Sequence, residues 1–119
     1  MQTITRKLGD FKPLIFKVDL SHYNKTSTDI EDIFCSIKTD LKSSDDALFL
    51  KKFTEGTINF VGTKSMLVNV EWLHNEYDKL PIGQYQLGLF IKFNGDAVAD
   101  ENVNQTFKVS IIQDFLKDN

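Results

Sequence analysis

Hydrophobic and polar residues alternate with a period of two along most of this chain. Successive side chains of a β-strand point to opposite faces, so the alternation predicts strands that are buried on one side. Five segments show the pattern strongly: residues 14–20, 33–38, 66–72, 84–93 and 106–111. Three segments with a weaker pattern also predict strands: residues 2–7, 47–53 and 57–62.

Polar segments with turn-forming residues separate the predicted strands, as at Gly9-Asp10 and Asn94-Gly95-Asp96. Helical candidates are limited to a turn around residues 73–79 and the tail from Gln113. The 119 residues suit a single domain. We therefore predict an all-β fold, an immunoglobulin-like antiparallel β-sandwich of about seven to eight strands. This domain is expected to span residues 1–112, followed by a short C-terminal tail at 113–119.

The most specific local signal is the segment at residues 78–85, with the sequence DKLPIGQY. A glycine two residues before a tyrosine that opens a long strand is typical of the tyrosine corner of immunoglobulin-like sandwiches. The hypothesis is that the Tyr85 hydroxyl binds the backbone and that Gly83 adopts a positive φ angle. The alternative is an ordinary aromatic residue at the start of a buried strand. Both give Tyr85 a structural role.

The charge distribution argues against nucleic acid as a partner. The formal net charge is −3, and the basic residues are scattered instead of forming the stripe that contacts phosphates. The N-terminal residues contain no apolar run suited to a signal peptide, and no segment approaches 18 apolar residues. We therefore expect synthesis in a cytoplasm, a soluble chain and no membrane partner.

The sequence contains no pattern typical of a catalytic, cofactor or metal site. The single cysteine, Cys35, lies in a strand-like apolar run and is expected to be a small buried residue. Acidic residues such as Asp96, Asp100 and Glu101 fall in predicted loops, without the rigid pairing of acid–base catalysis. The region lacks the spacing of a calcium-binding loop, and zinc clusters and nucleophile elbows are absent from the sequence. We predict that the protein is not an enzyme.

Several apolar residues fall on strand faces that their polar neighbours mark as outward. They are Ile15, Phe34, Leu67, Phe90 and Ile112. Several exposed apolar side chains on one face would form a docking patch. We take Ile15, Phe34 and Phe90 as the candidate interface. The alternative is that bulges turn some of them inward or that terminal segments cover them.

The order of features along the chain also resembles a known family. The features are Leu8-Gly9-Asp10-Phe11 after the first strand, Asp29-Ile30 before the strand at 33–38, the acidic turn Asp45-Asp46-Ala47, Leu80-Pro81-Ile82-Gly83-Gln84-Tyr85 after the strand at 66–72, and Phe107-Lys108-Val109 in the last strand. Together they resemble the immunoglobulin-like N-terminal domain of phage baseplate upper proteins. The similarity spans residues 2–112.

This resemblance implies a structural role in a bacteriophage particle. A domain of that family would join virion components through protein–protein contacts, in many copies or as a symmetric oligomer, after synthesis in the bacterial host cytoplasm. It implies no catalytic residues. A sandwich of this kind would also suit a neck, tail or capsid-associated position.

Two other classes of function compete with the virion role. One is a host-encoded sandwich that binds carbohydrate or another ligand, and the other is an accessory domain of an enzyme. Carbohydrate binding usually uses exposed aromatic rings, whereas Trp72 is in phase with the predicted core. The sequence therefore favours protein docking.

Overall fold

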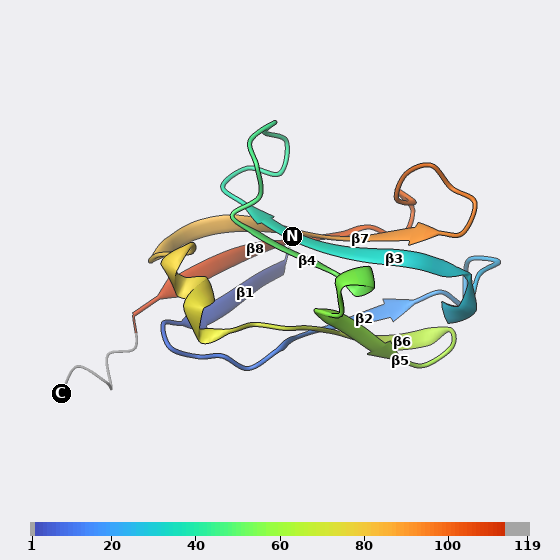
Figure 1. Ribbon diagram of the computed structural model, residues 1–119, viewed down its shortest axis with the longest axis horizontal. Coiled ribbons are helices and arrows are strands. Elements are labelled where there is room, and N and C mark those ends of the chain that lie inside the picture. The colour runs from blue at the N-terminus through green and yellow to red at the C-terminus, as the bar shows by residue number, and fades with distance from the viewer. Residues whose placement is uncertain (1, 114–119) are drawn as a thin grey trace.

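Eight β-strands in two facing sheets make up the computed structural model, which describes residues 2–113 (Figure 1). The five-stranded sheet contains, in spatial order, β1 (Gln2–Lys7), β8 (Gln105–Ile112), β7 (Gly83–Phe93), β3 (Ile30–Lys38) and β4 (Phe49–Lys52). The three-stranded sheet contains β2 (Leu14–Asp19), β6 (Ser65–Val70) and β5 (Ile58–Val61). The all-β prediction is confirmed, and each predicted strand segment overlaps one strand of the structure.

The described residues contain no α-helix, but three short 3-10 helices connect strands. They are η1 (Ser27–Asp29), η2 (Phe53–Glu55) and η3 (His74–Asp78). The helix η3 lies where a helical turn was predicted at residues 73–79. Residues 114–119, which make up most of the predicted C-terminal tail, lie outside the described residues.

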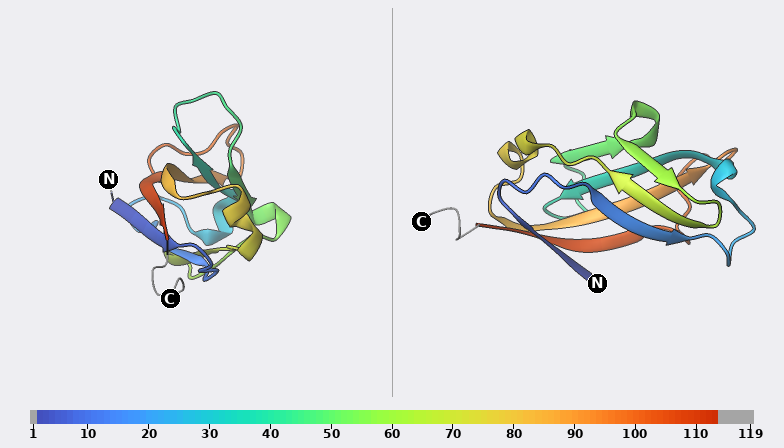
Figure 2. Two further views of the ribbon diagram at one scale, coloured as in Figure 1. Left: turned by 90° about the vertical axis from the view of Figure 1, so that its left-hand side faces the viewer. Right: turned by 90° about the horizontal axis from the view of Figure 1, so that it is seen from below.

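One strand pair departs from the antiparallel arrangement that we predicted. All other neighbouring strands are antiparallel, but β1 and β8 run parallel, with Gln2 opposite Phe107 and Lys7 opposite Ile112. The alternation of side chains is the same in both arrangements, so it does not reveal strand direction. The connection at residues 8–13 carries the chain from β1 to β2 in the other sheet, as Figure 2 shows.

Alternating side chains from both sheets form one hydrophobic core. In β2 the residues Leu14, Phe16 and Val18 are buried, and the residues between them are exposed. Other large side chains with almost no exposed surface include Phe49, Trp72, Phe93, Ile33, Ile37, Leu87 and Leu89. Each such side chain stabilises the fold by about 1.5–3 kcal/mol relative to an exposed one. The strand pattern of the sequence thus follows directly from burial between two layers.

Cys35 lies in the centre of this core, as the sequence predicted. Its side chain on β3 is completely buried, and it forms no disulfide bond. Burial raises the pKa of the thiol well above its usual value, an effect that the nearby Lys51 ammonium reduces only in part. The thiol is therefore protonated at neutral pH and unsuited to act as a nucleophile.

The segment before β7 contains the hydrogen bond that a tyrosine corner requires. The Tyr85 hydroxyl donates to the Pro81 carbonyl oxygen at 2.6 Å, and Tyr85 is itself buried. Burial also raises the pKa of this phenol. The hypothesis for Gly83 was wrong, because its φ angle is not positive. Gly83 begins β7 in ordinary strand pairing with Ile111, so the corner depends on the tyrosine and not on a special glycine conformation.

Candidate protein-docking surfaces

Two of the three predicted interface residues lie side by side on the outer face of the five-stranded sheet. Phe34 on β3 is directly opposite Phe90 on β7, and both side chains are half-buried. The Phe90 ring lies over Gly88, where any Cβ atom would overlap it. The Lys52 ammonium nitrogen lies 5.8 Å from the centre of the Phe34 ring. The absence of a side chain at Gly88 therefore leaves room for the Phe90 ring.

The long β3–β4 loop, residues 39–48, rises above this same face (Figure 1). The Leu41 backbone N–H donates to the Gln86 side-chain oxygen at 2.8 Å, which fixes the loop to the sheet. Between loop and sheet lies a groove of about 610 Å³, which we name the five-strand groove. Its lining residues are Asp40, Leu41, Lys42, Gln86, Phe90 and Thr106. An aromatic residue within a polar rim is the usual composition of a protein interface.

The third predicted residue, Ile15, lies on the opposite side of the molecule. It projects from the outer face of the three-stranded sheet and is 62% exposed. On this face Val61 and Leu67 are directly paired and are 61% and 42% exposed. We name Ile15, Val61 and Leu67 the three-strand patch. The prediction that Ile15 shares one surface with the two phenylalanines was therefore wrong, because β2 and β3 belong to different sheets.

Sequence reasoning missed several residues of these surfaces. Val61 lies in one of the weaker predicted strands, and its exposure depends on which sheet that strand joins. Leu50 on β4 is 47% exposed and faces outward opposite Ser36, close to Phe34. The contribution of the loop residue Leu41 follows from a hydrogen bond to a distant strand. Spacing along the chain contains no signal for this contact.

The charged residues of the described chain are arranged mainly as solvated or paired groups. The Asp19 carboxylate accepts a hydrogen bond from the Ser21 backbone N–H at 2.9 Å, and contacts with Ser21 lower its pKa. Lys51 and Glu76 form an ion pair of 2.6 Å between β4 and η3, with both side chains largely buried. Among residues 2–113 no three His, Cys, Asp or Glu side chains are grouped as metal ligands would be. No helix in that range has the length and hydrophobicity to span a membrane.

No protein-family model matches the sequence, and no curated protein matches it.

Proposed function

We propose that this chain is an immunoglobulin-like module that binds other proteins and catalyses no reaction. The strand order supports the fold assignment. If β2 to β8 are the immunoglobulin strands B, C, C′, D, E, F and G in turn, the sheets have the orders B-E-D and G-F-C-C′, as in that fold. The bond from Tyr85 to Pro81 then lies at the E–F corner, where the fold has its conserved tyrosine.

The partners that we propose are other structural proteins of a bacteriophage particle, at the baseplate, the tail, the neck or the capsid. The support is the resemblance of the sequence to the N-terminal domain of baseplate upper proteins. The features of that resemblance fall between or within strands of one sandwich. Virion components are present in many copies, so one docking surface would be used repeatedly around a symmetry axis.

The five-strand groove is the observation that carries the docking proposal. It combines concave shape, an aromatic anchor at Phe90 and polar groups at its rim. Anchors of this kind contribute most of the binding energy when they fill a pocket and lose contact with water. The three-strand patch is more exposed, but the groove offers more specific shape and hydrogen-bonding partners.

Replacement of Phe90 by serine tests this role. Because Phe90 is half-buried, the variant should lose less than the roughly 3–5 kcal/mol that truncation of a core phenylalanine costs. Particles are then produced in cells that supply the variant in place of the natural chain, and incorporated copies are counted by mass spectrometry. We expect incorporation to fall about tenfold or more, the effect of roughly 1.4 kcal/mol of lost binding.

Val98→Ser is the matched control, since Val98 is 73% exposed in the β7–β8 loop and lies outside the groove. It should leave both melting temperature and incorporation unchanged. Phe34→Ser should behave like Phe90→Ser if the two rings act together. Normal incorporation of folded Phe90→Ser would refute the groove as the interface, and purified particles without the natural chain would refute the virion role.

Trp72, the aromatic residue that a carbohydrate-binding site would use first, does not support the carbohydrate-binding alternative. Trp72 is only 2% exposed, and its ring packs on Phe49 at a distance of 5.1 Å between centres. A buried ring is not available to stack on a sugar. We therefore do not propose this function.

A further inference from the structure

Strand β2 is at the edge of the three-stranded sheet and pairs with β6 on one side. In an antiparallel pair, the backbone groups of alternate residues bond to the partner strand, and those of the residues between them point away. The Leu20 N–H donates to the Lys64 carbonyl oxygen at 2.7 Å, which assigns the even-numbered residues to the bonded set. The backbone groups of Ile15, Lys17 and Asp19 therefore point to the edge of the sheet.

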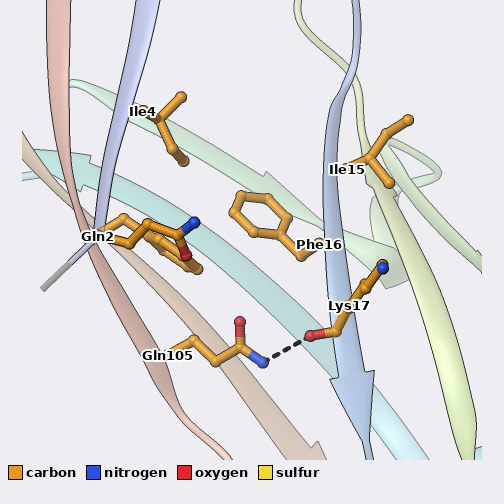
Figure 3. Close-up of a pocket in the computed structure, with 7 residues that line it drawn as sticks. Gln2, Ile4, Ile15, Phe16, Lys17 and Gln105 are labelled. Atoms are coloured by element: carbon orange, nitrogen blue, oxygen red, sulfur yellow. Dashed lines mark hydrogen bonds between the residues drawn. The ribbon is translucent and has the colours of Figure 1, made fainter.

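One of these outward groups already has a substitute partner. The Gln105 side-chain nitrogen donates to the Lys17 carbonyl oxygen at 2.9 Å (Figure 3). This bond confirms the direction in which the odd-numbered residues point. It also shows that a polar group approaches this edge where a neighbouring strand would otherwise lie.

A cleft of about 450 Å³ runs along the same edge. It separates β2 from β1 and β8 of the other sheet, and its sides are visible in Figure 3. The deeper wall is apolar: the Phe16 and Phe107 rings are in contact, with centres 5.2 Å apart, and Ile4 lies across from them. Phe107 and Ile4 are only half-buried. The cleft thus places hydrophobic surface directly beside the backbone donors and acceptors of β2 that point to the edge of the sheet.

We propose that β2 accepts an extended segment of a partner protein as a fourth strand of its sheet. Backbone groups of the segment would bond to Ile15, Lys17 and Asp19, and every second side chain would be apolar and face Phe16 and Ile4. Such strand addition draws affinity from the main chain and specificity from alternate side chains. This inference concerns a surface separate from the five-strand groove and does not depend on the virion role.

The other sheet edges are less suited to this role. Strands β4 and β5 have four residues each, so they offer fewer outward backbone groups than the six residues of β2. Strand β1 has six residues like β2, but Ile4 is its only apolar residue, so it offers little hydrophobic surface to an incoming strand. A second copy of the chain that paired symmetrically about Lys17 would place two lysines opposite each other, which is unfavourable. A foreign segment has no such restriction.

The probe for this proposal is a synthetic peptide with the sequence of residues 64–71, KSMLVNVE. This segment contains β6, which has the required alternation and pairs with the opposite edge of β2. The isotopically labelled full chain is titrated with peptide to about 1 mM, which detects weak binding. We expect the amides of Ile15, Lys17 and Asp19 to shift in NMR spectra and to exchange with solvent about tenfold more slowly. The same peptide, N-methylated at alternate amides, should have no effect.

Three variants separate edge pairing from general loss of structure. Lys17→Pro removes an N–H that faces the edge, a position where proline is tolerated, and it should abolish peptide binding while the chain stays folded. Val18→Pro removes an N–H that bonds to β6 and should unfold the sheet. Gln105→Ala frees the Lys17 carbonyl and should strengthen peptide binding severalfold.

The proposal is overturned by unchanged amides at 1 mM peptide, or by equal effects of the N-methylated peptide. Changes confined to even-numbered amides of β2 would also overturn it, because the peptide would then be replacing β6. Concentration-dependent dimerisation through β2 would assign the edge to a second copy instead. If Lys17→Pro fails to fold, the N-methylated peptide and Gln105→Ala still decide the matter.

Discussion

At the scale of single residues, small groups with defined partners determine the shape of this sandwich. Tyr85 connects the start of β7 to the preceding loop, Cys35 fills the space between the sheets, and Gly88 leaves room for the Phe90 ring. The role of Tyr85 was predictable because the corner is a local pattern of sequence. The space at Gly88 for the Phe90 ring could not be predicted, because it depends on the direction in which the Phe90 side chain points.

Tyr85→Phe should destabilise the protein by about 1–1.5 kcal/mol, because the part-buried hydrogen bond from the Tyr85 hydroxyl to the Pro81 carbonyl oxygen is lost. Urea denaturation measures the change. Tyr23→Phe is the matched control: its hydroxyl donates to Asn102 at 2.7 Å in an exposed position, so water replaces it at a cost below about 1 kcal/mol. Gly83→Ala should also be mild, since an added Cβ would make only ordinary contacts. A change within about 0.3 kcal/mol for Tyr85→Phe would mean that the corner bond contributes nothing.

The Cys35 thiol should react with a thiol reagent only when the whole domain unfolds. It is fully buried, and its raised pKa keeps it protonated in the folded state. The labelling rate in increasing urea should therefore follow the global unfolding equilibrium measured by tryptophan fluorescence. The denatured chain, which contains one cysteine, serves as the control for complete reaction. Fast labelling without denaturant would contradict the burial of this residue.

At the scale of the elements, the alternation of side chains was sufficient to predict all eight strands. It reports burial on one face, a property that each strand has by itself. It does not report the sheet to which a strand belongs or the direction of its neighbour. For this reason the alternation could not predict that β1 pairs with β8 in parallel. It also could not predict that Ile15 and Phe34 lie on different sheets.

The tight turn between β5 and β6 gives a prediction at this scale. Gly62 has a φ angle of +105°, and a Cβ there would overlap the Ser65 carbonyl. Gly62→Ala should therefore cost clearly more than the roughly 1 kcal/mol expected from positive φ alone. Gly95→Ala is the control, with φ +88° but no atom near the added Cβ. Equal melting temperatures for the two variants would show that the hairpin relaxes around the new side chain.

At the scale of the whole molecule, the two sheets present different surfaces to their surroundings. The five-stranded sheet has a groove under a long loop, and the three-stranded sheet has an exposed apolar patch and an open strand edge. The sequence predicted that outward apolar residues existed but not that they form two surfaces. Their grouping depends on sheet order, which is set by contacts between distant segments.

The most direct test of the docking account is a cryo-electron microscopy map of purified particles from cells that encode this chain. We predict repeated copies of the sandwich around a symmetry axis, each with Phe34 and Phe90 buried against a neighbouring protein. Particles without this chain, or copies whose five-strand groove faces solvent, would contradict it.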